Sequence, residues 1–460
     1  MTESLVPDLG PRPEPPNAGG RTVYVETYGC QMNVYDSQVI LGRMREAGFR
    51  EIDDHLEADV VLVNTCSVRE HAEHRVISRV GELRRSREHA GKDPALVGIC
   101  GCMAERLRDE LVRQRNRIDL VVGVDHYDEL PRLVGELLDP DPAPSAVAVG
   151  HDRRVHYVAP PEAYPTNHSH LVTIHKGCDY RCTYCIVPST RGPQVEKAPD
   201  LIEREIASIV ASGGREVTLL GQNVTAYRWS DELDFAALLQ RVARIEGLER
   251  VRFLTGHPCD MHPHLIDVIG AEEKVCPWLH VPAQSGSDRV LRRMKRHYRR
   301  DDYLAMVARA REVIEDVTFS GDFIVGFPGE TDEDFAATLS LVEEVGYDTI
   351  FSFKYSERPG VPAARLADDV PLEAKKERLA ALMAAQEAAW ARLAEAQVGR
   401  EVTAVVEEPA RRAAGSWRLR TGNNRKILVP LDEPTVGRAL RVRLTGWRNT
   451  SFFGEPVATA

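Results

Sequence analysis

Long apolar segments, internal repeats and an N-terminal targeting signal are all missing from this 460-residue sequence. No apolar run reaches the length that a transmembrane helix needs, so no membrane association is expected. Residues 1–20 are acidic and rich in proline and glycine, without the basic region or apolar core of a signal peptide, which predicts a disordered tail. Nine cysteines, an odd number, favour metal ligation in a reducing compartment over disulfides. We therefore expect a cytoplasmic protein.

A fourth cysteine is missing from the densest cysteine motif of the chain. Residues 175–186 read HKGCDYRCTYCI and place Cys178, Cys182 and Cys185 in a C-x3-C-x2-C array. Three thiolates at this spacing can bind three irons of a [4Fe-4S] cluster and leave the fourth iron open to a substrate or cofactor. A zinc site would need a second Cys/His pair at some distance, and none follows. The array resembles the signature of radical S-adenosylmethionine (SAM) enzymes, whose open iron binds the amino and carboxylate groups of that cofactor.

Three further cysteines stand at the ends of apolar runs in the region 21–150. This region alternates short apolar runs with helical stretches, which predicts a doubly wound parallel sheet. Cys30, Cys66 and Cys102 each end a different run (YVETYGC, VVLVNTC and ALVGICGC). Because parallel strands share one carboxyl edge, these cysteines should converge into a second three-thiolate site; buried structural cysteines are the alternative. Cys100 could face the same site or pack under a helix.

The central region, 167–397, follows a linker at 151–166 and alternates six predicted strands with helices. Six strands are typical of a partial (β/α)6 barrel, in which chemistry takes place at the strand carboxyl ends. Polar and glycine-rich residues stand at these ends and predict a cofactor pocket. The candidate cofactor contacts are Gly221, Gln222, Asn223, Gln284, Ser285 and Gly326.

The last region, 398–460, changes to short strands separated by turn residues, the pattern of a small β-barrel. It holds eleven Lys and Arg against six Asp and Glu, a net charge of +5 in a chain whose net charge is −11. Basic residues interleaved with aromatic and amide side chains are typical of RNA-binding surfaces. A basic barrel that only stabilises the fold is the alternative. A second basic run, 289–300, is either an RNA contact or a solvated helix face. The candidate RNA contacts in the barrel are Arg418, Arg420, Arg425 and Lys426.

Motifs along nearly the whole chain carry a resemblance to the methylthiotransferase family of radical SAM enzymes. They are TYGCQMN, NTCSVRE, GCMAER, GCDYRCTYCIVP, LLGQNV, PAQSGSD, GDFIVGFPGET and FSFKYSERPG. The first two most resemble the branch of tRNA-2-methylthio-N(6)-dimethylallyladenosine synthases, and the last region is similar to the RNA-binding TRAM domain. One departure is PSTRGPQVEK, where Pro193 and Gln194 replace the more basic run that the family would have.

The resemblance implies two [4Fe-4S] clusters with different tasks. The cluster on the C-x3-C-x2-C array, here the radical cluster, would reduce SAM to a 5′-deoxyadenosyl radical. This radical would remove hydrogen from C2 of N(6)-dimethylallyladenosine at position 37 of tRNA, next to the anticodon. The cluster on the three strand-ending cysteines, here the auxiliary cluster, would deliver methylated sulfur. Because the C2–H bond offers no acidic proton, no acid or base side chain is expected to be catalytic.

The same resemblance implies partners and alternatives. The partners are the tRNA anticodon loop, an electron donor of the flavodoxin or ferredoxin type, and an iron-sulfur or sulfur carrier; the enzyme is expected to be a monomer. Family alternatives are methylthiolation of threonylcarbamoyladenosine in tRNA or of a ribosomal protein aspartate. A non-enzymatic iron-sulfur regulator that binds RNA is a further alternative, and it would need neither an open iron nor a cofactor pocket.

Overall fold

The computed structural model describes residues 19–67, 70–113, 118–139, 141, 144–152, 168–410, 413 and 415–457. The tail expected at 1–20 and the linker expected at 151–166 lie outside the described residues, apart from the two residues at 19–20 and the two at 151–152. The chain forms two units, residues 1–152 and 153–460. No helix in the described part of the chain is long and apolar enough to span a membrane.

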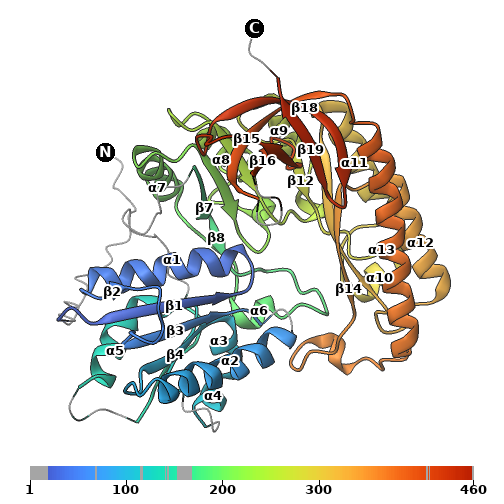
Figure 1. The fold of residues 1–460 in the computed structure, drawn as a ribbon. Helices are drawn as coiled ribbons and strands as arrows, with labels where there is room; N and C mark the ends of the chain where they lie inside the picture. Colours follow the sequence, from blue (N-terminus) through green and yellow to red (C-terminus); the bar gives the residue numbers. More distant parts are fainter. Residues whose placement is uncertain are drawn as a thin grey trace, which may run out of the picture. The chain divides into compact units, whose positions relative to one another are not determined.

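The first unit is a doubly wound parallel sheet, as the sequence predicts. Its strand order is β2-β1-β3-β4-β5-β6, which reverses direction between β1 and β3, the kind of switch point where ligands bind in open parallel sheets. Helices α1 and α2 lie on opposite faces of the sheet (Figure 1), so β3 and β4 are buried along their whole length. The strands are β1 (Thr22–Tyr28), β2 (Arg50–Glu51), β3 (Val60–Thr65), β4 (Leu96–Gly101), β5 (Leu120–Val122) and β6 (Ala146–Ala148). The helices are α1 (Gln31–Glu46), α2 (Glu70–His89), α3 (Cys102–Leu107), α4 (Asp109–Arg113) and α5 (Leu130–Leu137).

The second unit begins with the expected partial (β/α)6 barrel. Its six parallel strands form two three-stranded sheets, β11-β10-β7 and β12-β13-β14, and a parallel bridge between Val251 and Val275 links β11 to the segment before β12. The strands are β7 (Ser169–Thr173), β10 (Glu216–Leu220), β11 (Arg250–Phe253), β12 (Trp278–His280), β13 (Thr318–Val325) and β14 (Thr349–Lys354). The helices between and after them include α7 (Pro199–Ala211), α8 (Phe235–Ala243), α9 (Pro263–Ala271), α10 (Asp288–Arg293), α11 (Arg300–Val313), α12 (Asp332–Val345) and α13 (Leu372–Glu395).

The chain ends in a closed five-stranded barrel, which confirms the all-β prediction for this region. Its strands pair in the order β15-β16-β17-β19-β18 around an apolar core, to which Trp390 and Ala394 of α13 also contribute. The strands, drawn in red in Figure 1, are β15 (Glu401–Pro409), β16 (Ser416–Thr421), β17 (Lys426–Pro430), β18 (Ala439–Arg448) and β19 (Ser451–Pro456).

The β16–β17 turn attaches this barrel to the long side chain of a β11 residue and to the amino-terminal end of β13. Arg252 on β11 donates hydrogen bonds to the carbonyls of Thr421 (2.9 Å) and Gly422 (2.8 Å). Thr318, the first residue of β13, donates to the carbonyl of Asn423 (2.7 Å). The small barrel therefore packs at the end of the (β/α)6 strands opposite to their carboxyl ends.

Candidate cluster and cofactor sites

The C-x3-C-x2-C array lies in the loop after β7 and the two-residue strand β8 (His175–Lys176), at the carboxyl end of the (β/α)6 strands. The loop begins with a turn at Gly177, where φ is 72° and a Cβ would lie 1.9 Å from the carbonyl oxygen of Pro193. Only glycine fits at this position. Cys182 is buried, Cys178 and Cys185 are half-buried, and all three are free thiols.

The electrostatics of these thiols suit an iron-sulfur cluster. Burial raises the pKa of Cys178 to about 11 and that of Cys185 to about 12, and the neighbouring thiols add to both shifts, which places the three groups close together. At neutral pH such thiols stay protonated unless a positive centre stabilises the thiolate form. Bound iron supplies that positive charge, since metal ligation requires deprotonated cysteine.

A single metal ion would not suit the same residues. In the described part of the chain, no three His, Cys, Asp or Glu side chains are arranged to hold one ion. A [4Fe-4S] cluster makes a different demand, because its thiolates bind separate irons and stand further apart than the ligands of one ion. The donor set, three soft thiolates, also excludes a hard cation such as Mg²⁺.

A partly buried polar network fixes the cluster loop from the side of β11. The Tyr180 hydroxyl, within the loop, donates to the carboxylate of Asp260 at 3.0 and 3.1 Å, and Asn223 Nδ2 donates to the same carboxylate at 2.6 Å. The ring of His257 stacks on that of Tyr180 with centroids 4.0 Å apart. His257 Nε2 is buried and has no hydrogen-bond partner among the described residues. From the sequence, His257 is expected to have a capping or surface role and not to bind metal, and its side chain does cap the short helix at Pro258–Asp260. Sequence reasoning missed Asp260, whose one signal was its place in the segment after a predicted strand.

The first three predicted cofactor contacts follow β10. Gly221 lies against the imidazole of His175, where a Cβ would come within 2.2 Å of Nε2. Burial lowers the pKa of His175 to about 4, so its neutral ring donates from Nε2 to the carbonyl of Asn223 at 2.8 Å. Gln222 Oε1 is buried without a hydrogen-bond partner in the described structure, and it is the polar atom of this turn that a ligand could satisfy.

The next two predicted contacts follow β12. Gln284 adopts φ 65°, a left-handed conformation that costs a non-glycine residue about 1 kcal/mol and that clusters at functional sites. Its backbone bridges to β13, since its N–H donates to the carbonyl of Asp322 at 2.7 Å. Ser285 has internal partners instead, because its hydroxyl contacts that of Thr338 on α12 at 3.3 Å and accepts from the N–H of Ser287 at 3.2 Å.

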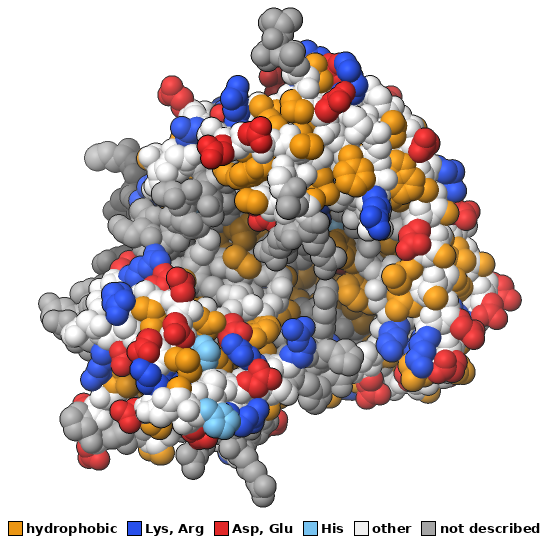
Figure 2. All heavy atoms as spheres, viewed as in Figure 1, with side chains coloured by type: hydrophobic (Ala, Val, Ile, Leu, Met, Phe, Trp, Pro, Cys, Tyr) orange, Lys and Arg blue, Asp and Glu red, His pale blue; other side chains and the backbone are white. Residues whose placement is uncertain are grey.

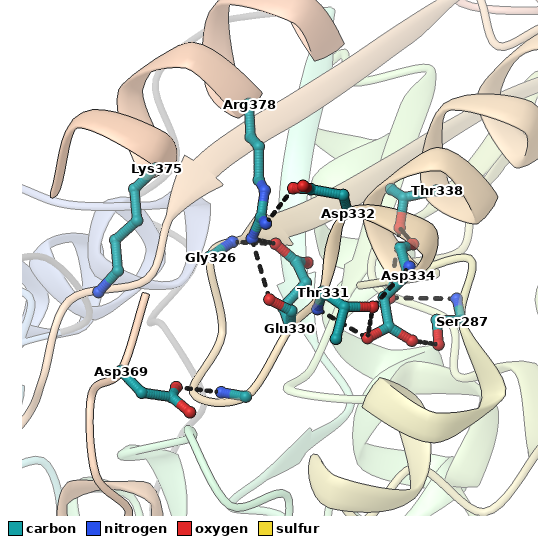
Figure 3. Close-up of polar contacts among 12 residues, drawn as sticks. Ser287, Gly326, Glu330, Thr331, Asp332, Asp334, Thr338, Asp369, Lys375 and Arg378 are labelled. Carbon is teal, nitrogen blue, oxygen red and sulfur yellow. Dashed lines mark hydrogen bonds and ion pairs between the residues drawn. The ribbon is translucent and has the colours of Figure 1, made fainter. Parts of the chain in front are cut away.

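The sixth predicted contact, Gly326, is the first residue of the turn after β13, and a buried ion pair stabilises this turn. Glu330 Oε2 accepts from the Gly326 N–H at 2.6 Å and from Arg378 Nη1 at 2.9 Å, and Arg378 also binds Asp332 at 2.7 Å. Figure 3 shows Glu330 and Arg378 at the centre of this network. Burial raises the pKa of Glu330, whose Oε1 is buried without a hydrogen-bond partner among the described residues. The network gives the carboxyl end of β13 a rigid loop beside the other predicted contacts.

In the first unit, the three strand-ending cysteines do meet at one edge. Strands β1, β3 and β4 are neighbours, and their last residues are in register. Gly29, Cys66 and Cys102 come next on the three strands, and Cys30 follows Gly29 as the N-cap of α1. Because neighbouring strands lie about 4.8 Å apart, the three thiols are within reach of one cluster. Cys66 and Cys102 are buried, and Cys30 is exposed.

Two buried asparagines brace this edge. Asn33 accepts from the N–H of Cys30 (3.3 Å) and donates to the carbonyl at the end of β3 (3.1 Å), while Asn64 donates to the carbonyl of Asn33 (2.8 Å). Gly29 has φ 150°, and a Cβ there would lie 2.8 Å from that of Cys66. These contacts explain why asparagine and glycine accompany the cysteines in TYGCQMN and NTC.

Cys100 does not join this edge. It is fully buried in β4, and burial, followed by the carboxylate of Asp36 on α1, raises the pKa of its thiol. The chain turns at Gly101, with φ 92°, before it reaches Cys102. Of the two placements that strand alternation left open, Cys100 therefore takes the one under a helix.

The four predicted RNA contacts have partners or neighbours within the fold. Arg425 has a side chain only 9 % exposed and pairs with Asp348 at 2.7 Å, which attaches the β16–β17 turn beside β14. Arg418 and Arg420 share the carboxylate of Glu407. Lys426 lies opposite Arg420 in the β16–β17 register. Its pKa is lowered by partial desolvation of the ammonium group and then by the neighbouring Arg420 and Arg418.

The surface charge agrees with this pairing. On the face seen in Figure 2, Lys and Arg side chains are interspersed with Asp and Glu. RNA contact through the barrel stays a prediction. In the basic run 289–300, Arg296 is buried and Arg300 is half-buried, whereas the other five Lys and Arg side chains are exposed. Two of the exposed arginines still have partners within the fold, since Arg289 binds Asp334 and Arg293 donates to the carbonyl of Pro328. Both interpretations of that run, an RNA contact and a solvated helix face, stay predictions.

Comparison with known proteins identifies the family. Residues 22–123 match the uncharacterized protein family UPF0004, and residues 172–342 match the radical SAM superfamily. A tRNA-2-methylthio-N(6)-dimethylallyladenosine synthase of Porphyromonas gingivalis is 41 % identical over 450 residues, which are 96 % of either chain. The chain belongs to the methylthiotransferase family of radical SAM enzymes. As a member of this family, the enzyme uses SAM and [4Fe-4S] clusters.

Solved structures agree on the fold of this radical SAM enzyme. The radical SAM methyltransferase TsrM from Kitasatospora setae, with cobalamin and a [4Fe-4S] cluster bound, is 16 % identical, with a TM-score of 0.54 over 75 % of this chain and 77 % of its own. The cobalamin-dependent SAM radical enzyme OxsB is 10 % identical, with a TM-score of 0.52 over 78 % of this chain and 56 % of its own. At such identities the likeness concerns the fold alone.

Proposed function

We propose that this enzyme adds a methylthio group to C2 of N(6)-dimethylallyladenosine at position 37 of tRNA, in the cytoplasm. One observation carries the proposal: the chain has two separate three-cysteine sites, each at the carboxyl edge of parallel strands. Hydrogen abstraction alone needs one cluster with an open iron, whereas insertion of sulfur needs a second centre that can present it. The 41 % identity to a synthase of this specificity supports the choice of nucleoside.

The chain's own residues divide the work. Cys178, Cys182 and Cys185 would hold the radical cluster, and the strand-ending cysteines of the first unit would hold the auxiliary cluster. When bound, the radical cluster supplies the electron that cleaves SAM, and the auxiliary cluster supplies the sulfur. The hydrogen bond of Tyr180 to Asp260 would keep the loop in one position.

The pocket residues would orient SAM rather than exchange protons with it. At neutral pH the His175 ring is uncharged and holds the turn after β10 by its bond to Asn223. The unsatisfied Gln222 Oε1 in that turn can accept a hydrogen bond from the cofactor. The ion pair of Glu330 and Arg378 fixes the turn after β13, so Gly326 would be held in place before the cofactor binds.

The proposed macromolecular partner is the tRNA anticodon loop. Its adenosine lies in a single-stranded loop, so extruding the base costs little compared with opening a duplex. Arg418, Arg420 and Lys426 would contact the phosphate backbone. An electron donor of the flavodoxin or ferredoxin type, a sulfur or iron-sulfur carrier and a monomeric state complete the proposal.

The test compares one cysteine of each site. The anaerobically reconstituted enzyme is given SAM, a reductant and tRNA that carries N(6)-dimethylallyladenosine, and 5′-deoxyadenosine and the methylthio nucleoside are measured by mass spectrometry. Cys66→Ala should form 5′-deoxyadenosine without methylthio product, and Cys182→Ala should form neither. Iron analysis should find two clusters in the unmodified protein and one after all three array cysteines are changed to Ala.

The control is Cys276→Ala, which removes a buried thiol outside both sites and should keep both products. Product formation by Cys66→Ala would refute the role of the auxiliary cluster. Turnover only on threonylcarbamoyladenosine, or only on a ribosomal protein, would correct the substrate and leave the radical chemistry in place.

A further inference from the structure

Arg296 is a buried cation beside the cluster loop. The residue is 8 % exposed, and its Nη1 donates to Cys182 Sγ at 3.6 Å. Nη2 donates to the carbonyl of Pro282 at 2.9 Å, just beyond β12, and Nε donates to the Tyr298 hydroxyl at 3.4 Å. The guanidinium also lies 5.3 Å from the centre of the Tyr298 ring. Every hydrogen-bond acceptor of Arg296 in these contacts is uncharged as long as Cys182 is a thiol.

Arg296 has no carboxylate partner among the residues that the structure describes. Among the described residues, none of the ion pairs includes Arg296, whereas two other buried arginines have carboxylate partners, Glu216 for Arg252 and Glu330 for Arg378. A buried charge is costly unless an opposite charge compensates it. Of the groups that accept a hydrogen bond from Arg296, the Cys182 thiol is the one that becomes an anion when it binds iron. Arg296 is thus placed to compensate a negative charge that only the loaded site carries.

The backbone conformation before Arg296 also positions its side chain beside Cys182. Lys295, directly before it, has φ 55°, a left-handed conformation that a non-glycine residue adopts at a cost. The two residues before Lys295 bind the cluster loop through their carbonyls. Thr183 N–H donates to the Met294 carbonyl at 3.0 Å, and the Thr183 hydroxyl donates to the Arg293 carbonyl at 3.1 Å. The turn at Lys295 and the hydrogen bonds from Thr183 together hold the Arg296 guanidinium beside the Cys182 sulfur.

We propose that Arg296 is the counter-ion of the radical cluster and sets its reduction potential. The proposal rests on the function proposed above, because it needs a cluster on Cys182. A [4Fe-4S] cluster on three thiolates carries net negative charge, and one-electron reduction makes it more negative. A fixed positive charge in a poorly solvated place stabilises the reduced form more than the oxidised form, so it raises the potential. Arg296 is a positioning residue, because it acts on SAM only through the cluster.

The test is a potentiometric titration of the reconstituted enzyme, followed by electron paramagnetic resonance. Only the signal that changes when SAM is added is scored, since it belongs to the radical cluster, which would bind SAM. In Arg296→Gln, the ratio of reduced to oxidised cluster at a fixed potential should fall at least about tenfold, which for a one-electron couple is about 59 mV. Arg296→Lys, which keeps the charge, should stay within about threefold of the unmodified enzyme. Arg292→Gln removes an exposed arginine of the same segment and should change nothing.

Several outcomes would overturn the proposal. The first is a ratio of reduced to oxidised cluster in Arg296→Gln that equals that of the unmodified enzyme. The second is a fall of this ratio in Arg296→Lys as large as in Arg296→Gln, because the charge of residue 296 would then not matter. A higher KM for SAM with an unchanged potential would show that Arg296 binds SAM and not the cluster. If Arg296→Gln retains no iron, the test rests on Arg296→Lys. This variant must then keep both the cluster and the ratio of reduced to oxidised cluster of the unmodified enzyme. An unmodified enzyme without any SAM-sensitive signal would refute the proposed function itself.

Discussion

Replacing Arg425 by methionine should weaken the attachment of the C-terminal barrel to the (β/α)6 strands. Arg425 and Asp348 form an ion pair of 2.7 Å, and their side chains are only 9 % and 13 % exposed. Burial raises the pKa of Asp348 even with the guanidinium beside it, so its carboxylate depends on Arg425. Removing one partner of a buried pair costs about 3–5 kcal/mol. Because water still reaches this pair, we expect about 3 kcal/mol.

The assay is urea unfolding followed by tryptophan fluorescence, since Trp390, Trp417 and Trp447 pack in or against the core of the small barrel. Arg418→Met is the matched control on the same hairpin. Its partners are Glu407 and Glu408, and its side chain is 32 % exposed, so the loss should be about 0–1 kcal/mol.

A double variant separates charge from packing. Arg425→Met together with Asp348→Leu should recover much of the lost stability, because no unpaired charge remains buried. The reasoning is refuted if Arg425→Met and Arg418→Met lose equal stability. It is also refuted if the double variant is less stable than Arg425→Met alone.

Three further predictions concern the cluster loop, the turn after β13 and the RNA surface. Gly177→Ala should lose the SAM-sensitive cluster, because a Cβ would collide with a carbonyl oxygen 1.9 Å away. The variant should keep the circular dichroism spectrum of the unmodified enzyme. An iron content equal to that of the unmodified enzyme would contradict this prediction. Burial opposes ionisation of Asp334, yet its hydrogen bonds, that from Arg289 foremost, lower its pKa to about 2. This folded pKa lies below the unfolded value of about 3.9, so the stabilisation is complete above that pH and is lost as pH falls through about 2. Asp334→Asn should therefore cost about 1–3 kcal/mol in urea unfolding of the apoprotein at pH 7 and less at pH 3, and an equal cost at both would refute the role of the charge. Alanine at the three barrel positions with solvent access should flatten the salt dependence of tRNA binding by up to about one unit of slope per lost contact, whereas Arg425→Met should leave the slope unchanged; an unchanged slope in the triple variant would leave the barrel a stabilising role. The three positions are Arg418, Arg420 and Lys426.

The candidate cluster sites could be predicted because their geometry follows from short-range rules. The C-x3-C-x2-C array lies within one loop, so its spacing alone brings the thiols together. The other three cysteines are far apart in sequence, but each ends a strand, and parallel strands bring their carboxyl ends to one edge. Strand register confirms the convergence of Cys30, Cys66 and Cys102. All six strands of the partial barrel were likewise predictable from apolar runs.

Charged residues were not predictable in the same way. Seven Lys and Arg crowd the run 289–300, and nothing in its composition distinguishes Arg296, buried at Cys182, from the exposed Arg292. The sequence does not distinguish Arg425 from the other barrel arginines, because its ion-pair partner, Asp348, lies 77 residues away.

The sequence by itself therefore determined the strands, the strand ends and the cysteines at them, because hydrophobic periodicity and cysteine spacing act over a few residues. Only the tertiary structure decided which charges are buried and which carboxylate or thiol each one meets. The physical reason is that the energy of an ion depends on its desolvation and on its nearest opposite charge. Both are properties of segments that the fold brings together, as with Glu330 and Arg378, which are 48 residues apart.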